Sequence, residues 1–124
     1  MKAVTIARQG DPVAPNIELV TDLPDPTAGP DQVVVRTEAT ALNHLDLWAG
    51  RGLPGLNLEY PKISGSDGCG IVEAVGDGVD DAWLGRRVVL NAARWIREPL
   101  VPGVLPAPGA LTMIGEHDPG THRE

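Results

Sequence analysis

The stretch GSDGCGIVEAVGDG, residues 65–78, tells more about the fold than any other part of the chain. Its second half, residues 71–75, is rich in Val and Ile, and glycines stand on both sides of it. Such short runs bounded by glycine are typical of β-strands. The stretch therefore predicts a strand over 71–75, entered through a glycine-rich segment and closed by the turn Gly76-Asp77-Gly78.

Four further runs outside this stretch have the composition of short strands: residues 2–7, 17–20, 33–39 and 87–90. Proline and glycine predict a loop over 22–32 and mostly irregular structure over 92–124. Short strands at regular spacing with one small helix are typical of small barrels. We therefore expect a mainly β protein, a partly open β-barrel with one or two short helices.

Residues 43–49 are the best candidate for a helix. Asn43 is a good N-cap, and Asp46 follows three residues later, where its carboxylate can accept from the backbone N–H of the cap. Gly50 and Gly52 predict the end of the helix. Apolar residues at helical spacing would lie on one side of it: Leu42, Leu45, and Trp48 or Ala49.

Composition limits the class of protein. The 124 residues suffice for one domain, and with no Phe, one Tyr and three Trp its core must consist mainly of Val, Leu, Ile and Ala. A net charge of −7 disfavours nucleic acid as a partner. One cysteine, Cys69, forms no internal disulfide, and no apolar run is long enough to span a membrane. We expect a soluble, cytoplasmic protein without a membrane partner.

Several motifs that could carry chemistry are incomplete. Neither Gly68-Cys69-Gly70 nor Gly76-Asp77-Gly78 completes the G-x-G-x-x-G sequence that cradles a dinucleotide. His117 and His122 could form a weak zinc or nickel site, although exposed loop histidines are the commoner case. Four arginines form either a solvated rim or an edge that faces an anion: Arg86, Arg87, Arg94 and Arg97.

Polar residues gather at the predicted helix start and at the glycine-rich strand entry. Asn43, His44 and Asp46 belong to the first group, and Ser66 and Asp67 to the second. They could simply cap the helix, or they could line a functional cleft. Spacing along the chain leaves both interpretations open.

The order of motifs resembles the N-terminal, GroES-like domain of the medium-chain dehydrogenase/reductase superfamily, which includes zinc alcohol dehydrogenases and zinc-free quinone oxidoreductases. The resemblance spans nearly the whole chain, residues 1–124, and rests on motifs in a fixed order: Met-Lys-Ala-Val at 1–4, Val-Val-Val-Arg at 33–36, residues 39–48 and 65–76, Leu-Gly-Arg-Arg-Val at 84–88, Ile-Gly-Glu-His at 114–117 and Gly-Thr at 120–121.

The resemblance implies that both zinc sites of the family are missing here. Zinc-dependent members have a cysteine where this chain has Asn43, a histidine where it has Ser66 and a glutamate where it has Asp67. The lobe that binds structural zinc through four cysteines would correspond to residues 92–114, which contain no cysteine. This pattern is similar to that of the quinone oxidoreductase branch, and it implies no bound metal.

The resemblance further implies a function in hydride transfer. Family members continue into a Rossmann domain that binds NAD(P), and we expect that domain to be absent from this chain. The chain would then be the substrate-side domain of a zinc-independent NAD(P)H-dependent oxidoreductase of carbonyls, quinones or enones, inactive alone. Asn43 and Asp46 would be catalytic, His44 would lie near the cofactor, and Ser66 and Asp67 would line the vestigial metal site.

Two other interpretations remain open at this stage. The chain could be a non-catalytic binding or chaperone-like module, because the family that it resembles is named for a co-chaperonin fold. It could also be a fragment that folds poorly and dimerises through the apolar surface left by a missing partner domain. A small-molecule substrate, the Rossmann domain and a second copy of the chain are thus the expected partners.

Overall fold

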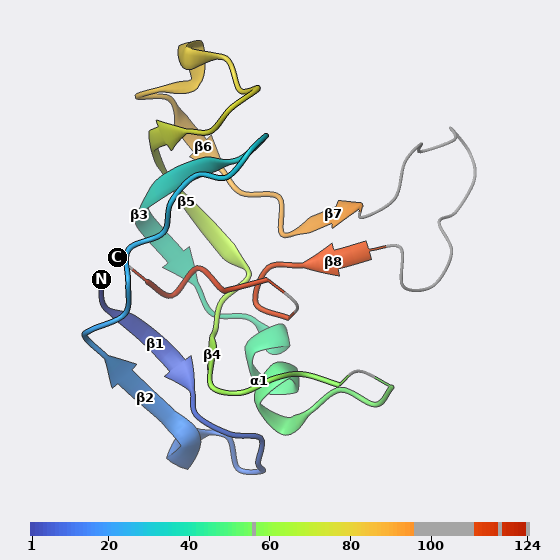
Figure 1. Ribbon diagram of the computed structural model, residues 1–124. Helices are drawn as coiled ribbons and strands as arrows, with labels where there is room; N and C mark the ends of the chain where they lie inside the picture. Colours follow the sequence, from blue (N-terminus) through green and yellow to red (C-terminus); the bar gives the residue numbers. More distant parts are fainter. Residues whose placement is uncertain (56, 96–110, 117, 124) are drawn as a thin grey trace, which may run out of the picture.

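The computed structural model describes residues 1–55, 57–95, 111–116 and 118–123. Its strands form three small antiparallel sheets with one α-helix beside them (Figure 1). The prediction of a mainly β protein is confirmed, and within the described ranges the strands close no barrel.

The first sheet has β1 (Ala3–Ile6) at its centre, between β2 (Ile17–Val20) and β4 (Lys62–Ile63). The predicted strands at 2–7 and 17–20 are confirmed, and the turn between them holds a 3₁₀ turn, η1 (Ala14–Asn16). The strand β4 was not predicted, because two residues beside proline and glycine carry no strand pattern.

The second sheet contains the two longest strands, β3 (Val33–Ala41) and β5 (Asp67–Val75), with β6 (Arg87–Val89) beside β5. Strand β5 begins four residues before the predicted start, inside the glycine-rich segment. Gly70 explains this difference, since a Cβ there would overlap the backbone carbonyl of Arg36 on β3. Glycine thus allows the backbones of β3 and β5 to approach closely. A 3₁₀ turn, η2 (Asp81–Trp83), connects β5 to β6.

The prediction of mostly irregular structure over 92–124 is wrong at two places. Strands β7 (Ala93–Trp95) and β8 (Leu111–Met113) pair in antiparallel register, Ala93 with Met113 and Trp95 with Leu111. Each strand has only three residues, so neither shows an alternating pattern, and their partners are distant in sequence. Residues 96–110 lie outside the described residues, so most of the predicted remnant of a zinc lobe at 92–114 does too.

The helix α1 (His44–Arg51) begins where the sequence predicted and ends two residues later. Gly50 is inside the helix, and Gly52 ends it with φ of 92°, a conformation that glycine adopts readily. The predicted apolar side is only partly correct. Leu42 precedes the helix and is 82% exposed, whereas Ala49 and Gly50 are buried.

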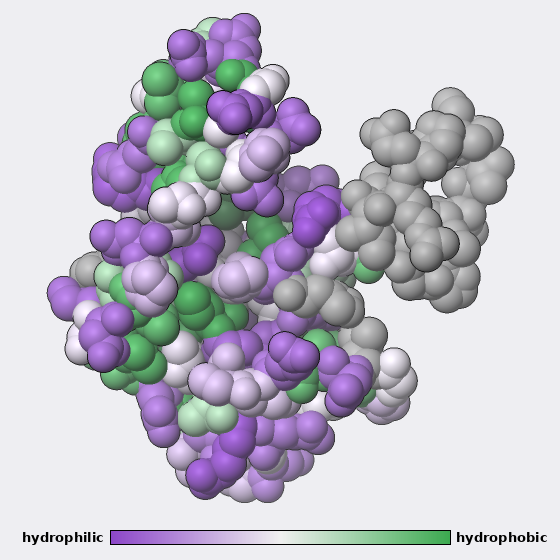
Figure 2. Space-filling model, viewed as in Figure 1, coloured by the Kyte–Doolittle hydropathy of each residue, from purple (hydrophilic) through white to green (hydrophobic). Residues whose placement is uncertain are grey.

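The core consists of small and branched side chains, as the shortage of aromatic residues predicted. The buried apolar residues are Ala3, Ile6, Val13, Ala49 and Val72. Other large apolar side chains stay exposed, and Figure 2 shows hydrophobic surface over β1, close to the two termini. Among the described helices, none has the length and hydrophobicity needed to cross a bilayer.

Candidate functional site

The start of α1 is built from a complete capping box. The Oδ1 atom of Asn43 accepts from the backbone N–H of Leu45 at 2.7 Å, and the Oδ2 atom of Asp46 accepts from the backbone N–H of Asn43 at 2.9 Å. These reciprocal bonds satisfy backbone N–H groups that the first helical turn leaves without partners. The capping role predicted for this pair is therefore confirmed.

The amide of Asn43 also connects the helix start to the start of β5. Its Nδ2 atom donates to the Ser66 hydroxyl oxygen at 2.8 Å and to Oδ2 of Asp67 at 2.5 Å. Ser66 is 2% exposed, whereas Asn43 and Asp67 are exposed. Both amide hydrogens are thus used within the protein, one in a buried contact with Ser66 and one in an exposed contact with Asp67.

Asp46 holds the other side of the same junction. Its second carboxylate oxygen, Oδ1, accepts from the backbone N–H of Gly65 at 2.9 Å. One carboxylate therefore bonds to the helix start and to the residue before Ser66. These contacts fix the distance between α1 and the segment that enters β5.

Four of the five site residues predicted from the sequence thus lie together, and we call them the junction cluster: Asn43, Asp46, Ser66 and Asp67. His44 is next to Asn43 in the chain, but its ring lies against Trp48, with ring centroids 5.9 Å apart and planes tilted by 35°. His44 is exposed. It is therefore available to a molecule that approaches α1 from solvent.

The donor atoms of the junction cluster are a poor match for zinc. They comprise one carboxamide, one hydroxyl and two carboxylates, and Asp46 already uses both of its oxygens on backbone N–H groups. Zinc sites in proteins consist of Cys, His and carboxylate ligands. Across the described residues, no group of three His, Cys, Asp or Glu side chains is arranged to hold a metal ion.

Of the two histidines near the C-terminus, His117 lies outside the described residues, so only His122 can be placed. His122 is not the freely exposed loop residue that the sequence suggested. It is half-buried, with Nδ1 at 2.9 Å from the Ser64 hydroxyl and Nε2 at 3.4 Å from the Ala41 carbonyl oxygen. Pairing between distant segments buries it, and local sequence could not predict that.

The arginine-rich segment is a charged rim with internal partners. Arg87 forms an ion pair with Glu38 at 2.5 Å, and Arg94 contacts both oxygens of Asp118 at 3.1 Å. The Asp118 carboxylate raises the pKa of the Arg94 guanidinium. These pairs favour the solvated-rim interpretation for the two residues, while Arg97 lies outside the described part of the chain.

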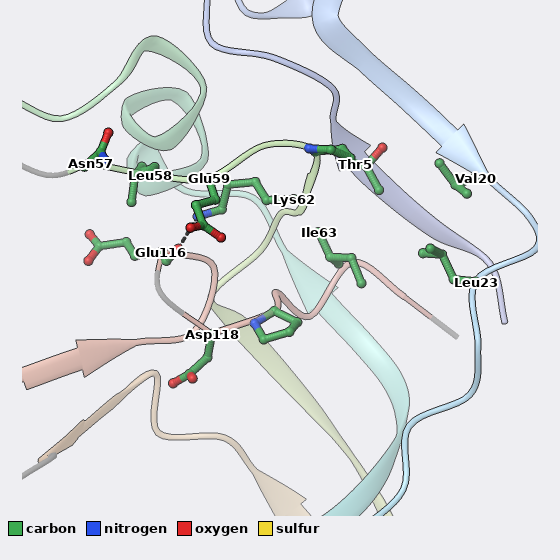
Figure 3. Close-up of a pocket in the computed structure, with 12 residues that line it drawn as sticks. Thr5, Val20, Leu23, Asn57, Leu58, Glu59, Lys62, Ile63, Glu116 and Asp118 are labelled. Atoms are coloured by element: carbon green, nitrogen blue, oxygen red, sulfur yellow. Dashed lines mark hydrogen bonds between the residues drawn. The ribbon is translucent and has the colours of Figure 1, made fainter.

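A separate hollow of about 650 Å³, which the sequence analysis missed, lies beside β1 and β4 (Figure 3). Thr5, Val20 and Ile63 form part of its wall, and Lys62 reaches across it to donate to the backbone carbonyl of Glu116. Burial lowers the pKa of the Lys62 amine, and the charge of Glu116 opposes that shift. No local motif marks Lys62, because its surroundings come from distant segments.

Known proteins are similar to this chain in sequence and in fold. Residues 29–110 match the family profile of the alcohol dehydrogenase GroES-like domain. A zinc-type alcohol dehydrogenase-like protein, YogA of Leptosphaeria maculans, is 40% identical over 82 residues, which are 62% of this chain and 22% of that protein.

Two solved structures are similar in fold and sequence. An NAD-dependent alcohol dehydrogenase superimposes with a TM-score of 0.78 at 36% identity, covering 98% of this chain and 35% of its own. The crotonyl-CoA carboxylase/reductase AntE V350A in complex with NADP gives a TM-score of 0.73 at 31% identity, covering 98% and 33%. The chain thus spans about a fifth to a third of the length of these relatives.

Proposed function

Because the chain belongs to the family of alcohol dehydrogenase GroES-like domains, we propose that it is the substrate-side domain of an NAD(P)-dependent oxidoreductase. The names of the similar proteins support this assignment, since they include an NAD-dependent dehydrogenase and a reductase that binds NADP. In this proposal residues 1–124 supply one wall of the active-site cleft, and a domain outside them supplies the cofactor platform. The sequence has one G-x-G-x-x-G run, at residues 50–55, but it ends the helix α1 instead of joining a strand to the start of a helix, so it lacks the context that holds a dinucleotide.

We further propose that the reaction proceeds without zinc, as a reduction of a carbonyl, quinone or enone or the reverse oxidation of an alcohol. The observation that carries this proposal is the bond from the Asn43 amide to Ser66 and Asp67. In the zinc-dependent pattern the positions of Asn43 and Ser66 hold metal ligands, whereas here Asn43, Ser66 and Asp67 satisfy each other by hydrogen bonding. A charge that develops on a substrate oxygen then needs hydrogen-bond donors for stabilisation.

Asn43 is the donor best placed for this task. Its contact with Asp67 is exposed, so a substrate oxygen can replace the Asp67 carboxylate as acceptor, while the contact with buried Ser66 keeps the amide oriented. Ser66 and Asp67 line the cleft at the vestigial metal site. Asp46 acts as a positioning residue through its bonds to Asn43 and Gly65. We assign His44, whose side chain is exposed, to the side of the cleft that faces the cofactor.

A chimera tests this proposal. In the similar NAD-dependent alcohol dehydrogenase, this chain replaces the matching third, so that the cofactor domain is supplied. We expect NAD(P)H-dependent turnover of a quinone, enone or aldehyde by metal-free protein. Removing one donor to a developing oxyanion costs about 10²–10³ in rate in well-studied enzymes, and we expect Asn43→Ala to lower kcat/KM by at least about tenfold.

The matched control is Asn57→Ala, which removes an exposed carboxamide that does not belong to the junction cluster. It should leave kcat/KM unchanged. A chimera that folds and binds NADPH but transfers hydride to none of the three substrate classes would contradict the proposal. Stoichiometric zinc in active protein would contradict its metal-free part.

A non-catalytic binding or chaperone-like module is the alternative function, and the oligomeric state separates the two. A co-chaperonin-like module should form a ring of several subunits, whereas the oxidoreductase domain should be a monomer or a homodimer in size-exclusion chromatography. A single cysteine, which suits a reducing compartment, supports a cytoplasmic location for the oxidoreductase.

A further inference from the structure

A second hollow, of about 500 Å³, is lined by His122 and Arg123 together with residues from the N-terminal half of the chain, and we call it the terminal groove. Its apolar lining comes from the start of β1, from β2 and from the residue before the helix cap: Ala3, Val4, Leu19 and Leu42. Leu19 is 67% exposed and Leu42 is 82% exposed. Large apolar side chains that gather around a hollow are typical of binding sites for apolar groups.

The ionisable side chains that line the terminal groove are those of Lys2, His122 and Arg123, and none of the acidic residues that the structure describes lines it. This is unusual for a chain with 17 acidic residues and 10 lysines and arginines. The local charge is therefore opposite to the net charge of the protein, so the groove favours a small anion while the protein as a whole repels a large polyanion.

Arg123 is the residue best placed to bind that anion. Its backbone is fixed by a bridge to Ala3 on β1, and its side chain is half-buried. Burial lowers the pKa of its guanidinium. Within the described part of the chain, its side chain has no acidic or hydrogen-bonding partner, and a desolvated guanidinium without an anion is unfavourable. A carboxylate satisfies it with two parallel hydrogen bonds.

From this combination we infer that the terminal groove binds an unbranched alkyl carboxylate, with the carboxylate on Arg123 and the chain along Leu19 and Leu42. The two ring nitrogens of His122 already have partners in Ser64 and Ala41, so His122 forms a fixed wall. The inference does not depend on hydride transfer, because it concerns binding to this chain alone.

Calorimetric titration of the 124-residue chain with decanoate, below its micelle concentration, tests the inference. We expect saturable binding of one decanoate per chain. Each methylene transferred from water contributes about a fourfold gain in affinity, so butyrate should bind at least about a hundredfold more weakly. Decanol, which has the chain without the charge, should also bind at least about tenfold more weakly than decanoate.

Two variants separate the charge from the apolar wall. Arg123→Gln should weaken decanoate binding at least about tenfold, while Arg8→Gln, which removes an exposed arginine from another part of the chain, should leave it unchanged. Leu42→Ser alters a side chain too exposed to matter for folding, and it should weaken binding about tenfold. Equal affinity for decanol and decanoate, or an unchanged affinity for decanoate in Arg123→Gln or in Leu42→Ser, would overturn the inference.

Discussion

Asn43 serves the helix and the junction cluster through different atoms. Its oxygen caps α1, and its nitrogen bonds to Ser66 and Asp67. Aspartate caps helices as well as asparagine does, so Asn43→Asp keeps the cap, removes the donor and puts a second carboxylate next to Asp67. We expect the free energy of unfolding to fall by about 1–2 kcal/mol at pH 7. The loss should shrink towards pH 4, because adjacent carboxylates then share a proton.

The comparison variant is Asn43→Ala, which loses the cap and the donor but adds no charge. Its loss of about 1–2 kcal/mol should be similar at both pH values, because the substitution introduces no charge. Urea unfolding of the two variants and the parent protein at pH 7 and pH 4 measures the difference. If Asn43→Asp shows no more pH dependence than Asn43→Ala, the contact between Asn43 and Asp67 is wrongly assigned.

Tyr60 connects the segment before β4 to the end of α1, because its hydroxyl donates to the backbone carbonyl of Ala49. Burial raises the pKa of this hydroxyl above its usual value of 10.0. The folded state therefore holds the proton more tightly than the unfolded state, and the stability due to Tyr60 is present below pH 10 and lost as the pH rises through the folded-state pKa.

Tyr60→Phe removes both the hydrogen bond and this titration. At pH 8 we expect it to lower the free energy of unfolding by about 1 kcal/mol. The difference between parent and variant should shrink as the pH rises above 10, since only the parent protein loses stability by ionising Tyr60. Equilibrium unfolding followed by circular dichroism measures it. A difference that stays constant or grows over this range would show that the Tyr60 hydroxyl is not protected by folding.

Among the elements, α1 and the short strands β7 and β8 show which features local sequence can predict and which it cannot. The Asn43 and Asp46 pair predicted the helix start because a capping box is complete within four residues. The helix end was missed because Gly50 normally disfavours a helix, and only its packing explains its presence. Strands β7 and β8 were missed because their three-residue runs depend on pairing with each other.

The same limit applies to the junction cluster. The spacing of residues 43 and 46 predicts their capping contact, but residues 66 and 67 join them only through the packing of α1 against the start of β5. Only the resemblance to a known family placed the two groups together before the structure did. The polarity of the terminal groove was also not predictable, since its lining comes from four separate segments.

Gly50 provides a test of how α1 packs on the turn before β2. A methyl group at Gly50 would overlap the side chain of Val13, although alanine favours a helix by about 1 kcal/mol over glycine. We therefore expect Gly50→Ala to lower the free energy of unfolding by about 1–3 kcal/mol. In a double-mutant cycle, Val13→Ala should relieve part of this loss, so the double variant is more stable than the sum of the single losses predicts. Strict additivity would exclude the contact.

At the scale of the whole molecule, hydrogen bonds from residues 118–123 connect the first sheet to the second. The backbone N–H groups of residues 120–122 donate to the carbonyls of residues 63–65, each at 3.0 Å, and Val4 of β1 donates to the carbonyl of His122 at 2.8 Å. The Thr121 hydroxyl donates to the carbonyl of Asp67 at the start of β5 at 2.8 Å. This segment therefore connects β1 and β4 of the first sheet to β5 of the second, next to the junction cluster.

Gly120 is the most sensitive point of this connection, because a Cβ there would overlap the carbonyl of Ser64. Gly120→Ala should lower the free energy of unfolding by about 1–3 kcal/mol and weaken the coupling between the sheets. The coupling is measured with two proteins that each keep one tryptophan as a fluorescent reporter: Trp48 on α1 in the first, and Trp83 on η2 in the second. Both proteins carry Trp95→Phe, and each also lacks the other reporter.

With Gly120 present, both tryptophans should give one urea midpoint, as a cooperative domain requires. In Gly120→Ala the urea midpoint reported by Trp48 should fall below that reported by Trp83. The reason is that β5 and β6 keep their own pairing, whereas the first sheet loses the hydrogen bonds that connect it to β5. The control is Gly85→Ala. A Cβ at Gly85 would meet no other atom, but the backbone φ of 75° is unfavourable for alanine, so the free energy of unfolding should fall by about 1 kcal/mol. The two urea midpoints should still coincide in this variant. Midpoints that coincide in Gly120→Ala as well would mean that other contacts couple the sheets.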